Sequence, residues 1–253
     1  IRRRYYDPSY TSEAISGTQG QSRRAEIKGS FRATDALRLD FGGDHEWSRI
    51  DVSGADRQKA NLASGHALLG YYTDAFSIAG GVRFDDHSRF GSKWTFGANG
   101  SVAIVDQWRV RASYGDGFKV PTLSQLFSVY GNTTLAPEKS RSYDLGVEYG
   151  NRNADLYFAV TGFRRDSRNL IDFSYCPDSN ALCDDGRFGY YNNVGSARAT
   201  GFELELAARI SRTLRAQSSY TYVKSVDRST GFNAGTDLPR RPRHALTVSA
   251  DWS

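Results

Sequence analysis

The sequence has no long hydrophobic run, and this absence limits how the chain can meet a membrane. No stretch of about 18 apolar residues occurs, and the mean hydropathy is −0.56. A transmembrane helix is therefore excluded, because it would carry many charged side chains into hydrocarbon. A transmembrane β-strand is not excluded, because only every second residue of such a strand needs to be apolar.

Methionine is absent altogether, and the chain begins at Ile1 without a charged and apolar targeting segment. We therefore expect residues 1–253 to be an interior fragment of a longer gene product, from which any signal peptide has been lost. Disorder is excluded, because disordered chains are poor in the aromatic residues that make up 13% of this one.

Cysteine is scarce as well, with only Cys176 and Cys183 in the polar segment SYCPDSNALCDDG. Two cysteines this close together predict a disulfide that closes a small exposed loop in an oxidising compartment. A metal pair fits less well, because the segment has neither a CxxC spacing nor a neighbouring histidine.

Residues that support catalysis are equally few. The chain has four histidines and contains no GxSxG or HExxH motif. The adjacent carboxylates Asp85-Asp86 and Asp184-Asp185 would face opposite sides of a strand or lie in a solvated loop. We therefore expect no enzyme and no resident cofactor. The alternative is a barrel hydrolase that uses residues at the rim of the lumen.

The basic pI of about 9.2 does not point to nucleic acid. It reflects 33 basic and 28 acidic residues, a net charge of +5, and the two signs are interspersed along the chain. No basic patch stands out, so we expect no nucleic-acid partner.

What the sequence does have is alternation, with apolar or aromatic residues at every second position. Such a period of two places one kind of residue on each face of a β-sheet. About eleven strands are expected from it. The clearest segments are Leu37–Trp47, Phe76–Asp85, Lys93–Val102, Trp108–Tyr114, Tyr143–Tyr149 and Leu246–Trp252.

The predicted connections alternate in length. Short polar turns are expected at residues 34–36, 73–75, 105–107, 151–154 and 210–213, and longer polar segments at 48–60, 116–140, 174–190 and 228–241. Short turns at one end and long loops at the other are typical of outer-membrane barrels. A soluble β-sandwich, whose strands also alternate, is the competing architecture. The charged face favours the barrel, because a lumen can hold water and polar side chains.

The segment YGDGFKVPTLSQLF, Tyr114–Phe127, resembles the GxGFKxPTLxxLF signature of TonB-dependent receptors. Three more segments resemble elements of the same family in the same order: Asn132–Gly150, Asn192–Leu206 and Leu238–Trp252. The first motif is most similar to the cobalamin-receptor branch, and siderophore and haem receptors carry similar versions.

The motif residues have a structural role more readily than a ligand-binding one. Proline ends a strand because it cannot donate to the ladder, and glycine permits close approach of neighbouring strands. Glu138 and Arg141 are predicted to pair at the base of a loop. The motif positions expected to build the barrel are Gly117, Phe118, Pro121, Leu126, Pro137, Glu138, Ser140, Gly201, Glu203 and Pro242.

The resemblance implies an all-β fold, an antiparallel transmembrane β-barrel. Residues 1–253 would be a fragment of that single domain, about half of a 22-stranded barrel, without the plug domain and the C-terminal strands. It also implies import of cobalamin, a ferric siderophore or haem across the outer membrane of a Gram-negative bacterium. The implied partners are the TonB protein, acting through the plug, the small-molecule nutrient and outer-membrane lipid.

Ligand contacts are expected from aromatic residues in the long loops, where rigid rings can meet a flat ligand. The candidates are Phe127, Tyr130, Tyr175, Tyr190 and Tyr191. Asp178, Asp184 and Asp185 offer hard oxygen ligands for a loop calcium ion, although their spacing matches no recognised cage. Two other functions remain open at this point: a passive porin-like diffusion barrel and a soluble extracellular β-protein used for binding.

Overall fold

In the computed structural model, strands make up most of the chain. The structure describes residues 2–6, 14–176, 181–184, 186–230 and 234–252. The elements are β1 (Arg2–Tyr6), β2 (Ala14–Arg32), β3 (Leu37–Val52), β4 (Gln58–Tyr72), β5 (Phe76–His87), β6 (Gly91–Val105), β7 (Trp108–Lys119), α1 (Leu123–Phe127), β8 (Glu138–Tyr149), β9 (Leu156–Tyr175), a 3₁₀ turn η1 (Ala181–Cys183), β10 (Gly189–Arg209), β11 (Leu214–Asp227) and β12 (His244–Trp252).

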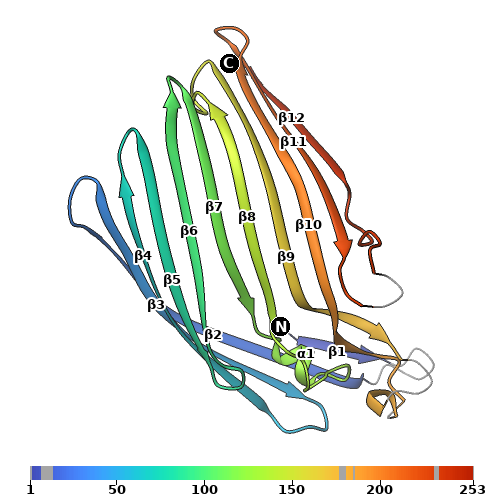
Figure 1. Cartoon of the computed structure of the whole chain (residues 1–253). Coiled ribbons are helices and arrows are strands. Elements are labelled where there is room, and N and C mark those ends of the chain that lie inside the picture. The colour runs from blue at the N-terminus through green and yellow to red at the C-terminus, as the bar shows by residue number, and fades with distance from the viewer. Residues whose placement is uncertain (1, 7–13, 177–180, 185, 231–233, 253) are drawn as a thin grey trace.

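Each strand pairs antiparallel with the next strand in the sequence. Within the described residues they form one sheet of 12 strands in the order β1 to β12, one strand more than the alternation predicted. The sheet curves like a section of a cylinder wall (Figure 1). β1 and β12 are its two edge strands, so the all-β, antiparallel prediction is confirmed and the described strands form an open wall.

The alternation of connection lengths is confirmed with shorter loops than predicted. The turns at 33–36, 73–75, 106–107, 150–155 and 210–213 lie together at one end of the sheet, the upper end in Figure 1. The predicted loop at 48–60 is wrong in its bounds, because β3 and β4 continue to Val52 and from Gln58. Similarly, β7 and β8 take both ends of 116–140. These polar strand ends remain extended because their backbone groups complete the hydrogen-bond ladder with the neighbouring strand.

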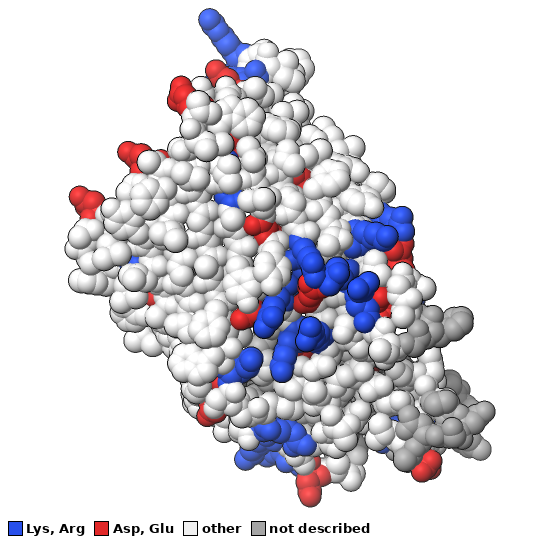
Figure 2. All heavy atoms as spheres, in the orientation of Figure 1, with Lys and Arg blue, Asp and Glu red and all other residues white. Residues whose placement is uncertain are grey.

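One face of the sheet is apolar and exposed. Ile27, Leu69, Ile78, Phe96 and Leu145 are all more than half exposed, and their rows run across neighbouring strands in register. A broad area without charges covers this face in Figure 2. We call this area the apolar band.

The opposite face is polar. Asp44 is 8% exposed and lies 3.1 Å from Arg24 and 3.3 Å from Arg83. Arg83 also contacts Asp85 at 2.9 Å, and the Asp85 carboxylate accepts a hydrogen bond from Ser64. These charges are paired across strands and so compensate one another. The apolar residues form no single core, and the described cluster of buried residues is only Tyr157, Ala159 and Ala207.

The α-helix α1 lies against the polar face at the long-loop end, beside β3 and β4. We therefore call the polar face, which α1 covers at this end, the inner face, and the apolar face the outer face. No helix among the described residues is long and apolar enough to cross a membrane.

Candidate functional site

Helix α1 is held by its own cap and by one buried side chain. Pro121 is buried and ends the extended chain that follows β7. Thr122 accepts a hydrogen bond from the Gln125 N–H, and the Gln125 side chain accepts one from the Thr122 N–H, which forms a capping box. Leu126, at 2% exposure, anchors the helix. The motif therefore directs the chain across the inner face.

A cavity of about 720 Å³ lies between α1 and the inner face of β2–β5. Ile50, Ala60 and Leu62 give it apolar walls. Glu46 gives it a negative charge, and the Glu46 carboxylate accepts hydrogen bonds from Ser22 and Ser48, each 2.8 Å long. The cavity is large enough for a small organic ligand.

His87, at the end of β5, also lines the cavity. It is 6% exposed and lies beyond the apolar band. Burial lowers its pKa from the ordinary value of 6.5, and the neighbouring charge of Arg89 acts in the same direction. The neutral ring accepts the Arg89 N–H at Nδ1 over 3.1 Å. His87 is therefore a neutral hydrogen-bonding group at neutral pH.

An aromatic cluster lies where the loops after β7 and β9 meet. Phe173 is its centre, with ring centroids 5.4 Å from Tyr130, 5.8 Å from Tyr175 and 5.8 Å from Tyr191. Phe188 lies 5.5 Å from Phe173 and completes the cluster. Several pairs are edge-to-face, the arrangement that aromatic rings favour. Tyr191 also lines the cavity, so the cluster is continuous with it.

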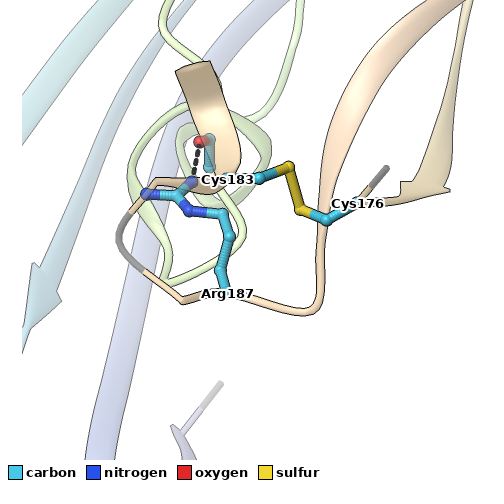
Figure 3. The surroundings of a disulfide bond; sticks show 4 residues. Cys176, Cys183 and Arg187 are labelled. Atoms are coloured by element: carbon cyan, nitrogen blue, oxygen red, sulfur yellow. Dashed lines mark hydrogen bonds between the residues drawn. A yellow bond between two sulfur atoms is a disulfide. The ribbon is translucent and has the colours of Figure 1, made fainter. Parts of the chain in front are cut away.

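The disulfide predicted from the sequence is confirmed. Cys176 and Cys183 are bonded, and Arg187 lies beside them (Figure 3). The guanidinium of Arg187 donates to the Gly131 carbonyl over 2.9 Å. The loop after β9 is therefore tied to the loop after β7 by a charged donor as well as by ring contacts.

Two asparagines fasten the loop after β7 to β10. Asn132 is 3% exposed, and its amide donates to the Tyr191 carbonyl over 3.0 Å. Asn193 accepts the Ala136 N–H and donates to the Ala136 carbonyl. Because these side chains satisfy backbone groups that the ladder leaves open, this loop forms one body with the end of the sheet.

The predicted ligand residues are only partly brought together. Tyr130, Tyr175 and Tyr191 share the aromatic cluster. Phe127 lies apart from it on α1, with the Arg89 guanidinium 4.8 Å from its ring centroid. Tyr190 is 7% exposed and offers little surface to a ligand.

The structural motif residues lie where strands begin, end or approach closely. Phe118 is in β7, Glu203 is exposed in β10, and Pro242 is exposed before β12. A Cβ at Gly117 would lie 2.3 Å from the Ser140 hydroxyl, and one at Gly201 would lie 2.0 Å from the Tyr222 carbonyl oxygen. Pro137 precedes β8, and its carbonyl accepts a hydrogen bond from Asn169.

The predicted pairing of Glu138 with Arg141 is wrong. Glu138 accepts the Ile171 N–H over 3.0 Å and lies 3.5 Å from Lys119. Arg141 instead pairs with Asp116 at 3.4 Å. The two residues are three apart in β8, and an odd separation places their side chains on opposite faces of the strand.

Calcium binding by the loop acids stays a prediction. Among the described residues no three His, Cys, Asp or Glu side chains gather as a metal site. Asp184 is exposed, and Asp178 and Asp185 lie outside the described residues. Sequence reasoning missed Phe173, Phe188 and His87. The two phenylalanines flank the cysteines in the segment that already held Tyr175, and this proximity was the available signal.

Comparison with known proteins gives a family and a set of folds. The family model described as TonB dependent receptor-like, beta-barrel matches residues 2–253. The chain is similar to the siderophore receptor PirA of Pseudomonas aeruginosa, with 22% identity and a TM-score of 0.72 over 94% of this chain and 43% of that one.

Two further structures give the same result. A mutant of the ferric enterobactin receptor of Pseudomonas aeruginosa shows 20% identity and a TM-score of 0.75, over 98% of this chain and 41% of that one. The FrpB iron transporter of Neisseria meningitidis shows 13% identity and a TM-score of 0.69, over 94% and 41%. The chain thus spans about two fifths of these structures, and at such identities the likeness shows the fold.

Proposed function

Because the chain belongs to the TonB-dependent receptor β-barrel family, we propose that it forms part of an outer-membrane receptor that imports a ferric siderophore in a Gram-negative bacterium. The proposal makes the protein a transporter and not an enzyme. Its exposed apolar band would face lipid, and its polar inner face would line the lumen.

The observation that carries the proposal is the inner cavity at the long-loop end with the aromatic cluster beside it. The cavity lies between α1 and the sheet, and Tyr191 belongs to both features. The loops that hold it are fastened by Asn132, Asn193 and Arg187. A rigid, partly aromatic recess on the lumen side is what a receptor needs to capture a ligand before it crosses the barrel.

A ferric siderophore fits this recess better than the other nutrients of the family for two reasons. Aromatic rings can stack on catecholate or similar rings. The similar structures named above also include siderophore receptors. Iron enters this proposal as cargo. Cobalamin and haem remain the other candidate nutrients.

Energy-coupled import requires more than these strands. The proposal includes a plug domain outside the 253 residues, through which the TonB protein would act. It also includes further strands that pair with the edges β1 and β12, since lipid leaves no solvent for unpaired backbone groups.

The test is uptake of radioactive iron by cells that lack their own siderophore receptors and express the full-length protein. Ferric catecholate, ferric hydroxamate, haem and labelled cobalamin are supplied separately, with and without TonB. The variant Tyr130→Ala/Tyr191→Ala removes two rings of the aromatic cluster. Tyr72→Ala, an exposed tyrosine at the short-turn end, is the matched control.

We expect TonB-dependent uptake of one ferric siderophore, reduced at least about tenfold by the double variant and little changed by the control. TonB-independent leakage of several solutes would replace the receptor by a diffusion barrel. Uptake of cobalamin or haem alone would keep the receptor and overturn the siderophore assignment.

A further inference from the structure

A group of basic side chains lies on the outer face of the sheet, directly beyond the apolar band. It consists of Lys139 and Arg141 of β8, Arg164 and Arg168 of β9, Arg198 of β10 and Arg228, and we call it the basic cluster. Figure 2 shows Lys and Arg gathered right of the centre of this face, beside and below the broad uncharged area at the upper left.

The strand register fixes the order of these levels. In β8 the outward residues run from Val147 and Leu145 through Tyr143 to Arg141 and Lys139. Tyr143 of β8 is paired with Arg164 of the neighbouring strand β9, and Arg141 of β8 is paired with Asp166 of β9. Aliphatic residues, then a tyrosine, then positive charge is the order expected across a lipid boundary, from acyl chains to headgroups.

The cluster carries more positive charge than its carboxylates neutralise. Asp166 lies 2.7 Å from Arg164 and 2.6 Å from Arg198, and Asp116 pairs with Arg141. These two acids face seven basic side chains in the same recess, the six of the basic cluster and Lys93 of β6.

Within the basic cluster, Lys139, Arg168 and Arg228 have no carboxylate partner among the described residues, and Lys139 and Arg168 form a pair. They stand directly opposite each other in the β8–β9 register. Like charges in this position are destabilising unless an anion lies between them. The recess has a volume of about 460 Å³ and polar as well as aromatic walls, including Tyr143.

We propose that the basic cluster binds the phosphate groups of a phosphorylated glycolipid in the outer leaflet, of the lipid A type, whose acyl chains lie on the apolar band. The inference rests on the outer-membrane location in the proposed function. Guanidinium groups bind phosphate with paired, charge-assisted hydrogen bonds. The long-loop end faces outward in such barrels, which selects the outer leaflet. The continuous apolar surface next to the charges selects a lipid over a soluble anion.

The test uses the full-length protein in neutral detergent micelles, titrated with bisphosphorylated lipid A, with phosphatidylglycerol or with inorganic phosphate. The variant Lys139→Gln/Arg168→Gln removes two of the three unneutralised charges of the cluster, so no carboxylate loses its partner. Arg165→Gln is the matched control, because Arg165 is on the same strand and points to the inner face, where it donates to Ser140. The readouts are the apparent Kd and the thermal unfolding midpoint.

Without lipid the double variant should be at least as stable as the wild type, because a repulsion has been removed. Its lipid A affinity should fall about tenfold or more, and the control should bind as the wild type does. Equal lipid A binding by the double variant would overturn the inference. So would wild-type binding of phosphatidylglycerol or inorganic phosphate as tightly as lipid A.

The result is separable from the transport proposal. Lipid A binding is measured without iron or TonB, so a protein that binds lipid A through this cluster and imports no siderophore would overturn only the proposed function. A protein that imports a siderophore and ignores lipid A would overturn only the inference.

Discussion

His87 is a buried group whose protonation should change stability. Its pKa is lowered in the folded protein, first by burial, while the unfolded chain titrates near 6.5. Folding therefore favours the neutral ring, and this contribution is present above pH 6.5 and lost as the pH falls through the lower folded pKa. We expect the unfolding midpoint to drop between about pH 7.5 and about pH 5, and His87→Gln to reduce that drop. The exposed His244→Gln is the control; an unchanged drop in His87→Gln would contradict the assignment.

Gly201 permits the close approach of β10 and β11. An added Cβ would lie 2.0 Å from the Tyr222 carbonyl oxygen, a backbone atom that cannot move without its strand. We expect Gly201→Ala to lower the unfolding midpoint clearly. Gly80→Ala should have little effect, since no atom lies within 4 Å of its added Cβ. Both variants are measured in the same detergent. Equal unfolding midpoints would contradict the prediction, because they would mean that β11 can move away from the added methyl group without cost.

At the scale of elements, α1 should be the most easily loosened part of the candidate site. It is short, so its own hydrogen bonds cannot hold it. We expect Leu126→Ala to cost about 2–5 kcal/mol locally, and Thr122→Val to remove the capping box at a cost of about 1 kcal/mol. Hydrogen exchange of residues 122–128 measures both effects. Leu123→Ala, which changes a less buried side chain, is the comparison, and exchange as fast as in Leu126→Ala would show that burial does not anchor the helix.

The loop after β9 should depend on its disulfide. Closing a loop with a sequence separation of 7 removes freedom from the open chain and stabilises the loop by about 2–3 kcal/mol. We expect Cys176→Ser/Cys183→Ser to raise the rate of proteolysis in this loop severalfold, with the sheet intact. Arg187→Gln, which loses the bond to Gly131 and keeps the disulfide, should raise it less. Equal rates in the double variant and wild type would mean that the aromatic cluster alone holds the loop.

The alternation predicted the strands well because it follows from the pleat and needs no knowledge of neighbours. Strand ends were predicted less well. At the ends of β3 and β4 the pattern reverses: Ile50 and Ala60 line the inner face, while Arg49 and Lys59 lie on the outer one, and ladder hydrogen bonding continues the strands. The aromatic cluster was predicted only in part. Which rings meet depends on how β9 pairs with β10 and on where the loop after β7 lies against β9. The β9–β10 register pairs Phe173 with Tyr191 and so brings these two rings together.

At the scale of the whole molecule, the sheet is a wall with one polar and one apolar face. The inner face pairs its charges, as Asp44 does with Arg24 and Arg83. The outer face exposes side chains such as Leu145, at 63%. A soluble β-sandwich would bury that face against a second sheet, whereas the described residues form a single sheet; under the proposed function, lipid covers the exposed face.

If the apolar face meets lipid, as the proposed function requires, the cost of an added arginine should depend on its position along the strand. Leu145 lies in the middle of the apolar band, so Leu145→Arg in the full-length protein should cost about 2–4 kcal/mol in a bilayer. The same change at Tyr143, the level of the boundary, should cost about 0–1 kcal/mol, because the cost falls toward the interface. Reversible unfolding of both variants in phosphatidylcholine vesicles measures the difference. Equal costs would contradict the lipid face, because an aqueous surface has no gradient of polarity along a strand.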